Sequence, residues 1–183
     1  MSSSNSETEI KLRVASAEEA RARLTRLGAA LATERHLEDN VLYDDAAGSL
    51  RLAGRVLRLR RAAGTAVVTY KGPGTIADDV KSREELEVVV SSAEVCERIF
   101  SGLGLLKRFR YQKYRAVYRL EDALVFVDET PVGTFLEVEG SAADIHDVAT
   151  ALGFSREDYV FESYPALFLA SGAKGDMLIE PQR

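Results

Sequence analysis

Apolar and charged residues alternate along several segments of the chain, a pattern typical of β-strands with two different faces. In residues 7–14, with the sequence ETEIKLRV, two acids and two bases share one face and Thr8, Ile10, Leu12 and Val14 share the other. Runs of similar character recur later in the chain. Together they predict eight strands, at 7–14, 32–44, 55–61, 65–71, 81–90, 106–119, 123–128 and 134–139.

A helical pattern follows three of these strands. Residues 16–28, 92–104 and 141–153 each begin with serine, carry apolar residues at helical spacing and end at glycine. A carboxylate three residues after a serine is close to a capping box, which predicts helix starts. The pairs with this spacing are Ser16 with Glu19, Ser91 with Glu94, and Ser141 with Asp144. Cys96 and His146 lie on these helices, and we expect both to be structural.

Near the end of the chain, the sequence SYPALFLASG predicts a short helix capped by Ser163, with Pro165 in its first turn. Residues 173–183 are expected to form a loose tail.

Long strands joined by short turns tend to avoid open edges by closing into a barrel. We therefore expect an α+β fold: a closed eight-stranded antiparallel β-barrel with helices packed on the outside. The chain length of 183 residues favours one domain, 1–183, with an ordered core over about 7–172.

Composition narrows the class of protein. Hydrophobic residues make up 46% of the chain and charged residues 29%, as in ordinary globular proteins, and no apolar run is long enough to cross a bilayer. The polar start MSSSNSE does not resemble a secretory signal, and a single cysteine suits a reducing compartment, so a cytoplasmic protein is expected.

The net charge of −5 argues against nucleic acid as a partner. A homodimer is only a default expectation.

The candidate metal chemistry depends on oxygen ligands. With two histidines and one cysteine, the chain has no residues for a soft zinc cluster. Carboxylates would have to hold any metal, which favours Mg²⁺, Mn²⁺ or Ca²⁺.

If helices cover the apolar outer face of the barrel, the charged face must line its interior. Buried charges must neutralise one another or bind ions. Internal salt bridges alone could satisfy them, in a purely structural barrel. Alternatively, a triphosphate would meet the bases while divalent cations meet the acids, and arginine is suited to phosphate because its planar fork donates two hydrogen bonds.

The charged motifs also resemble a known family. ETEIK at 7–11 is similar to the ExExK signature of the CYTH superfamily, the triphosphate tunnel metalloenzymes. Later motifs follow in the same order over residues 7 to about 170: VLRLR, TYKGP, REELE, KYR, Asp128 and LEVEG. HLEDNVLYDD at 36–45 and SYPALF at 163–168 look most like the CyaB-type class IV adenylate cyclase branch.

The resemblance implies a role for each charged position. Metal ligation of one or two Mg²⁺ or Mn²⁺ would fall to Glu7, Glu9, Asp128, Glu137 and Glu139. The triphosphate would be bound by Lys11, Arg58, Arg60, Lys71, Arg83, Lys113 and Arg115. Glu85 and Glu87, with Lys11, would be the catalytic residues, and the two glutamates would either hold a second metal or orient water.

Two enzymatic reactions fit these roles. In an adenylate cyclase, the ribose 3′-hydroxyl attacks the α-phosphorus of ATP and gives cyclic AMP and pyrophosphate. In a triphosphatase, water attacks the γ-phosphorus, and the substrate is inorganic tripolyphosphate, thiamine triphosphate or a nucleoside triphosphate. A module that binds polyphosphate or nucleotide without catalysis is the alternative of another class.

Residue spacing does not choose between these functions. Base contacts could come from His36, Glu38 and Asn40, or from Tyr43, Tyr70, Tyr111 and Tyr114, although packing is the simpler role for all of them.

Overall fold

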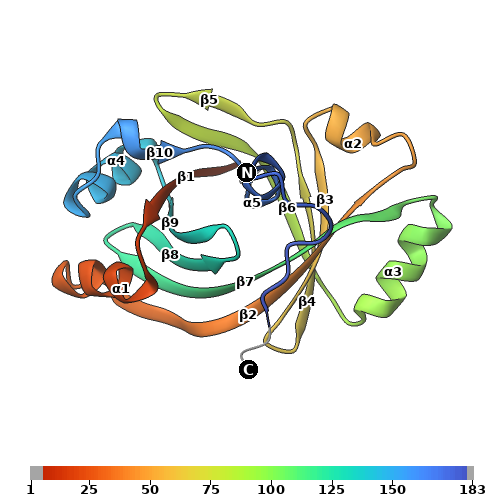
Figure 1. Ribbon diagram of the computed structural model, residues 1–183, viewed down its shortest axis with the longest axis horizontal. Helices are drawn as coiled ribbons and strands as arrows, with labels where there is room; N and C mark the ends of the chain where they lie inside the picture. Colours follow the sequence, from red (N-terminus) through yellow and green to blue (C-terminus); the bar gives the residue numbers. More distant parts are fainter. Residues whose placement is uncertain (1–5, 181–183) are drawn as a thin grey trace, which may run out of the picture.

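The computed structural model describes residues 6–180 and contains ten strands and five α-helices in this part of the chain (Figure 1). The strands are β1 (Ser6–Val14), β2 (Ala30–Asp44), β3 (Val56–Ala62), β4 (Thr65–Lys71), β5 (Thr75–Ala77), β6 (Val80–Val90), β7 (Leu106–Leu120), β8 (Ala123–Thr130), β9 (Gly133–Glu139) and β10 (Tyr159–Val160). The helices are α1 (Ala17–Arg26), α2 (Ser49–Leu52), α3 (Ala93–Gly102), α4 (Ala142–Ala151) and α5 (Tyr164–Ala170), and a 3₁₀ turn spans Arg156–Asp158.

Eight of the strands form a closed antiparallel barrel. Their order is β1-β9-β8-β7-β2-β3-β4-β6, and residues Ser6–Glu9 of β1 pair with Lys81–Glu84 of β6 to complete the ring. The prediction of a closed eight-stranded barrel with outer helices is confirmed. The short strands β5 and β10 add to β6 and β1 outside this ring and were not predicted, because two or three residues carry too little alternation to be recognised.

Serine caps start the predicted helices, with one correction. Ser16, Ser141 and Ser163 each accept a backbone N–H of the first turn. The prediction of Ser91 for the middle helix was wrong by one residue: Ser92 is the N-cap, and its hydroxyl accepts the N–H of Val95. Because Ser91 and Ser92 are adjacent, a three-residue spacing to an acid could not by itself identify the cap.

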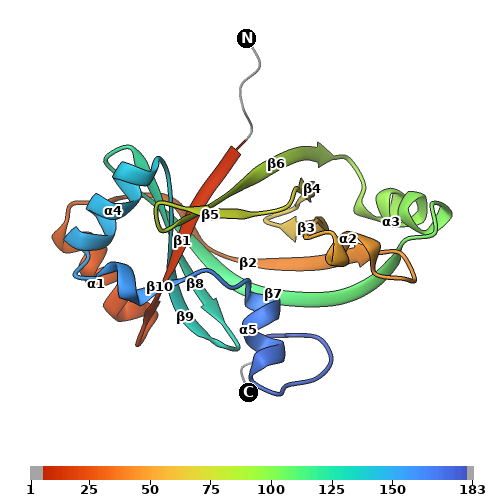
Figure 2. The ribbon, with the colours of Figure 1, turned by 90° about the horizontal axis from the view of Figure 1, so that it is seen from above.

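The outer helices bury the apolar faces of the strands. Helices α1 and α4 lie together against β1, β8 and β9 (Figures 1 and 2), and the core between them includes Leu12, Leu24, Val138 and Ile145, each at most 1% exposed. A smaller core forms between α3 and β2–β4, where Cys96 packs. The inner faces of the strands are therefore left to the charged residues.

Helix α5 and the segment after it close one end of the barrel. Figure 2 shows α5 on the side of the ring opposite β6, and Figure 1 shows it in front of the ring. Tyr164 and Met177 pack there with Tyr111 and Phe135. We call this group, with its partly buried neighbours, the apolar plug, and the neighbours are Leu42, Phe109, Val132, Leu167 and Phe168.

The expected loose tail at 173–183 was wrong for the residues around Met177. Met177 is fully buried, its N–H donates to the carbonyl of Arg110, and its carbonyl accepts the N–H of Gln112. These contacts use the edge of β7 that β8 does not reach. Residues 181–183 lie outside the described residues. No helix among residues 6–180 is both long and apolar enough to cross a membrane.

Candidate active site

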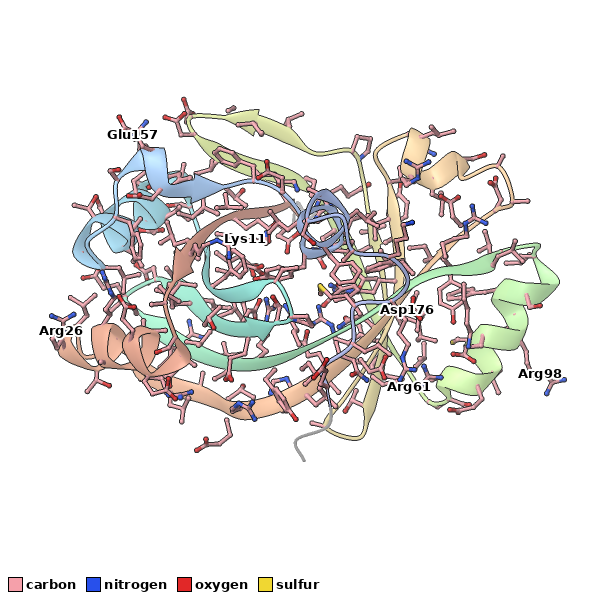
Figure 3. The ribbon with its side chains drawn as sticks, viewed as in Figure 1. Lys11, Arg26, Arg61, Arg98, Glu157 and Asp176 are labelled. Atoms are coloured by element: carbon pink, nitrogen blue, oxygen red, sulfur yellow. The ribbon has the colours of Figure 1, made fainter. Side chains whose placement is uncertain are left out.

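The barrel encloses a cavity of about 550 Å³ whose wall is mostly charged. Eight basic and six acidic side chains line it, together with a smaller number of apolar and aromatic ones. Lys11 is seen among the side chains inside the ring in Figure 3. Thirteen of the predicted site residues come together here: Glu7, Glu9, Lys11, Arg58, Arg60, Lys71, Arg83, Glu85, Glu87, Lys113, Arg115, Glu137 and Glu139.

The acids come from three strands, and most of the bases come from others. All six glutamates belong to β1, β9 and β6, whereas Arg58, Arg60, Lys113 and Arg115 belong to β3 and β7. The register of the barrel explains this division: β1 lies between β9 and β6, so Glu9 stands opposite Glu139, and Glu7 stands opposite Arg83. We call the inner faces of β1, β9 and β6 the acidic wall.

Two lysines neutralise part of the acidic wall. Lys11 Nζ lies 3.0 Å from Glu9 Oε1 and 3.5 Å from Glu137 Oε2. On the other side of β1, Lys71 of β4 reaches Glu7, and its Nζ lies 3.0 Å from Glu85 Oε2. Two lysines thus contact four carboxylates. Arg83 also lies within 4 Å of Glu7 and Glu9, and Arg58 lies within 4 Å of Glu85 and Glu87.

The uneven contact with bases separates the pKa values of the glutamates. Burial tends to raise the pKa of Glu7, but Lys71 outweighs it and lowers that pKa to about 2. Burial and the neighbouring Glu7 raise the pKa of Glu85 to about 7. Burial, Glu7 and Glu137 raise the pKa of Glu139 to about 7 as well, and within residues 6–180 no base lies within 4 Å of the Glu139 carboxylate.

The bases on the opposite side are held by buried acids and amides. Lys113 Nζ lies 2.8 Å from Asp128, and Arg115 donates to Asp128 and to Glu137. Arg60 donates to the amide oxygen of Asn40 and pairs with Glu38 at 3.1 Å. We call the inner faces of β7, β8 and β2 the paired wall.

Asp128 does not line the cavity with the four glutamates expected to hold metal. Its side chain is fully buried and accepts hydrogen bonds from Lys113, Arg115 and the Tyr164 hydroxyl. Its carboxylate lies behind the wall, where it fixes two bases. The alternation of residues along β8 predicted that Asp128 lies on the inner face. The sequence could not show that Lys113 and Arg115 would donate hydrogen bonds to both of its carboxylate oxygens.

Glu38 and Asn40 have a similar supporting role. Glu38 is 2% exposed, and burial, which tends to raise its pKa, is outweighed by Lys113, Arg115 and Arg60, so that its pKa falls to about 2. Asn40 is fully buried beneath Arg60. His36 lies 3.8 Å from Glu38, and none of the three lines the cavity within the described part of the chain.

The cavity also contains residues that the sequence did not assign to the site. Tyr111 was one of four tyrosines considered for base contacts, and it lines the cavity, whereas Tyr43, Tyr70 and Tyr114 do not. Arg51, Phe126 and Tyr164 line the cavity and were not predicted. Phe126 was recoverable in principle, since it lies two residues before Asp128 on the same strand face. Arg51 and Tyr164 lie on helices, so strand periodicity carried no information about them.

The chemistry of the acidic wall suits a hard divalent cation. Carboxylate oxygens from adjacent strands face one cavity. Burial and neighbouring acids raise the pKa values of Glu85 and Glu139 to about 7, and a bound cation would stabilise their ionised forms. Among residues 6–180 no three acidic, histidine or cysteine side chains are already arranged as a metal cluster. The donor set fits the metal, while the ligand geometry would need to contract around it.

A closed barrel with a charged interior, acids on one side and bases on the other, defines a polar-tunnel class of protein, and comparison with known proteins agrees. Residues 5–159 match the CYTH domain, and the chain belongs to this family. It is 30% identical over 169 residues to a candidate adenylate cyclase of Methanocaldococcus jannaschii, covering 86% of this chain and 95% of that protein.

Solved structures show the same fold. A candidate adenylate cyclase from Vibrio parahaemolyticus superposes with a TM-score of 0.81 at 17% identity, over 91% of this chain and 99% of that one. A candidate adenylyl cyclase from Hippeastrum, described as having a dominant triphosphatase activity, superposes with a TM-score of 0.67 at 22% identity, over 90% of this chain and 96% of that one.

Proposed function

We propose that this protein is a divalent-metal-dependent enzyme that acts on a triphosphate inside the barrel. The observation that carries the proposal is the division of one cavity into an acidic wall and a basic side. A triphosphate is a chain of anionic groups that needs several bases along its length, and a divalent cation needs carboxylates beside it. Both requirements are met within about 550 Å³.

In this proposal the bases bind and orient the phosphates. Arg58, Arg60, Lys113 and Arg115 approach from β3 and β7, Lys11 and Arg83 approach from the acidic wall, and Lys71 approaches from β4. Buried acids behind Lys113 and Arg115 hold these side chains in place before a ligand arrives. Preorganised bases of this kind favour phosphoryl transfer, which depends on position and charge neutralisation.

The carboxylates of Glu7, Glu9, Glu137 and Glu139 would hold Mg²⁺ or Mn²⁺. A bound divalent ion supplies charge neutralisation at the phosphate oxygens and lowers the pKa of an attacking hydroxyl or water. Glu85 stands beside Glu7 with a pKa near 7, so it is the side chain best suited to accept a proton near neutral pH.

Two reactions use this arrangement, and each has support. Cyclisation of ATP is the first candidate, because the Methanocaldococcus relative and the Vibrio structure are both called candidate adenylate cyclases. Hydrolysis of a triphosphate is the second, because the Hippeastrum protein with this fold has a dominant triphosphatase activity. The difference lies in which nucleophile reaches which phosphorus.

Product analysis tests the proposal. Purified protein is incubated with ATP or tripolyphosphate and with Mg²⁺ or Mn²⁺, and cyclic AMP, ADP, pyrophosphate and phosphate are separated by chromatography. We expect metal-dependent product formation that Glu7→Gln abolishes. Metal-dependent binding without any product would favour the non-catalytic module. A melting temperature that tripolyphosphate leaves unchanged would favour a purely structural barrel, because a ligand that binds only the folded state must raise it.

A matched pair of arginine variants tests the position of the substrate. Arg58 is 7% exposed in the cavity, whereas Arg98 lies on the outer surface of α3 (Figure 3). Arg58→Ala is expected to raise KM for the triphosphate by about tenfold or more, since bonds to a charged group contribute about 1.5–3 kcal/mol. Arg98→Ala should leave KM unchanged. Equal behaviour of the two variants would contradict the assignment of the cavity.

A further inference from the structure

The second half of β6 has one uncovered edge. Residues Glu85–Val90 pair with β4 along one edge of the strand. At the other edge, β1 reaches only Lys81–Glu84, and within residues 6–180 no strand pairs with Glu85–Val90 on that side. An uncovered edge presents backbone N–H and C=O groups and is a template for a further strand.

The alternation of the backbone groups shows which residues face this edge. Glu84 accepts the N–H of Gly72 from the β4 side. Successive residues of a strand direct their backbone groups to opposite sides, so Glu87 and Val89 direct theirs to the uncovered edge. A second strand could therefore bond to these two residues.

The outer face of the same stretch is apolar and continues onto α3. Because Glu85 and Glu87 line the cavity, the residues that alternate with them point outward. Val88 stands opposite Val68 of β4, which packs beneath α3, so the exposed residues of β6 adjoin those of the helix. Five exposed apolar residues form what we call the β6–α3 face: Leu86, Val88, Val95, Ile99 and Leu103.

The β6–α3 face is large for a surface left to water. Its side chains are 45–71% exposed and amount to roughly 500 Å² of apolar surface, near the upper end of the range for the largest apolar patch of a monomer. One side of a standard protein interface buries about 800 Å², of which a little more than half is apolar. The face therefore has the apolar area that one side of such an interface needs.

Neither of the two helices that cover the larger core can reach this face. Strand β6 leads into α3 at the end of the molecule away from α1 and α4 (Figures 1 and 2). The three face residues of α3 follow one another at four-residue spacing, so they form one stripe on the helix. The charged residues Glu94, Glu97 and Arg98 lie off this stripe.

We propose that the β6–α3 face and the uncovered edge of β6 bind a second copy of this chain, with a two-fold axis at Val88. The two β6 strands pair antiparallel, and Glu87 and Val89 exchange backbone hydrogen bonds with the second copy's Val89 and Glu87. Leu86 faces the second copy's Val90. The helices α3 of both copies lie on the same side of the joined sheet, and their apolar stripes flank the joined strands.

The sequence of the edge favours a second copy as the occupant. A two-fold axis at Val88 places apolar residues opposite apolar ones and keeps the two copies of Glu87 apart, whereas like charges directly opposite one another are destabilising. The five residues before Ser6 are the other candidate occupant. Their sequence, MSSSN, has one apolar residue and is too short to cover both β6 and α3.

Two exposed strand residues supply a matched test. Val88 is 57% exposed at the proposed axis, and Ile76 of β5 is 60% exposed outside the face. Lysine at either position should be compatible with folding, which a melting curve verifies, but Val88→Lys places two like charges opposite one another across the axis. Molecular mass is measured by sedimentation equilibrium over a range of protein concentrations.

The wild type and Ile76→Lys are expected to reach twice the 20.1 kDa mass of one chain. Val88→Lys should raise the dissociation constant of the dimer by about tenfold or more, and Ile99→Lys on α3 should raise it by about fivefold or more. An equal mixture of Val88→Lys and Val88→Glu should recover a dimer with one copy of each, because unlike charges then face each other across the axis.

Four results would overturn the inference. The wild type could be monomeric at every concentration, and a dimer that then forms only when residues 2–5 are deleted would identify those residues as the occupant of the edge. Val88→Lys or Ile99→Lys could leave the dimer unchanged, which would place the interface elsewhere. The mixture of oppositely charged variants could stay monomeric, which would exclude a two-fold axis at Val88. These measurements need no substrate, so their outcome is independent of the proposed function.

Discussion

The acidic wall and the paired wall both bury charged side chains, but they neutralise them differently. On the paired wall, Asp128 is fully buried and is contacted by Lys113, Arg115 and Tyr164, so its charge is matched within the protein. On the acidic wall the pairing is uneven: five of the six glutamates contact at least one lysine or arginine, whereas Glu139 has no base within 4 Å among the described residues.

The difference indicates which charges serve the fold and which are kept for a ligand. A buried acid with full pairing positions its partners, and removing it leaves uncompensated cations. A buried acid that faces other acids and contacts no base is costly to ionise without a cation, and its ionised form gains most when a cation binds. Stability and metal dependence should therefore respond in opposite ways to mutations on the two walls.

The largest effect is expected from Asp128→Asn. The substitution leaves Lys113 and Arg115 without their main buried counter-charge and should lower the free energy of unfolding by about 3–5 kcal/mol, measured by urea denaturation. Asp79→Asn is the control, because Asp79 and Arg156 form an ion pair whose side chains are 55% and 59% exposed, and such pairs contribute about 0–1 kcal/mol. Similar losses in both variants would remove the distinction between buried and exposed pairing.

Glu139→Gln should show the opposite behaviour. The substitution breaks no ion pair of the folded protein and removes one source of repulsion between acids. The free energy of unfolding in EDTA should therefore not fall. The metal concentration for half-maximal activity should rise by about tenfold or more, measured by titration with Mg²⁺ or Mn²⁺. A variant that is less stable in EDTA but needs no more metal would place Glu139 among the structural charges.

The dependence of stability on pH should also differ between the acidic wall and the paired wall. The pKa values of Glu85 and Glu139 lie near 7 in the folded protein, above the ordinary value of 4.5, so between these values the folded state keeps protons that the unfolded state releases. Their contribution to stability is complete below pH 4.5 and is lost as pH rises to 7. The pKa of Glu38 is lowered to about 2, so its contribution grows as pH rises from 2 to 4.5.

Melting temperatures measured from pH 2 to 8, in EDTA and in Mg²⁺, test this dependence. We expect the decline between pH 4.5 and 7 in EDTA to be reduced by Mg²⁺, which binds the deprotonated glutamates, and to be smaller in Glu139→Gln. A decline of the same size under all three conditions would show that other groups cause it.

The smallest effect is expected from Tyr164→Phe. The variant keeps the ring, which lies 5.2 Å from Lys113 Nζ and 5.7 Å from Lys11 Nζ, and loses the hydroxyl that donates to Asp128. Because both bases still hold Asp128, the free energy of unfolding should fall by about 0.5–1.5 kcal/mol, measured by urea denaturation. A loss as large as that of Asp128→Asn would mean that the hydroxyl, and not the bases, determines the stability of this wall.

Much of the barrel and cavity could be predicted from sequence because strand alternation reports directly which face a side chain occupies. Glu9, Arg60 and Glu137 were placed on inner faces by this period alone, and all three line the cavity. The apolar outer faces implied covering helices, and serine caps located three of their starts to within a residue.

Alternation could not show how deep a residue lies or which neighbour it meets. Asp128 and Glu137 lie on the same face of the adjacent strands β8 and β9, yet only Glu137 lines the cavity. Arg51 and Tyr164 were missed because they lie on helices α2 and α5, and a helix's position over a barrel depends on tertiary packing. The ordered position of Met177 was missed because backbone hydrogen bonds to the edge of β7 fix it, and no pattern of side chains predicts such bonds.

The barrel closes where β1 meets β6, and Glu7 in that pairing also contacts Lys71 and Arg83 of neighbouring strands. Residues from the two ends of a long stretch of chain must therefore meet before the cavity has a complete wall. Closure of the ring and completion of its ionic lining therefore depend on the same short pairing. A change that frays only the first few residues of β1 should abolish activity while the outer helices and most of the sheet remain folded.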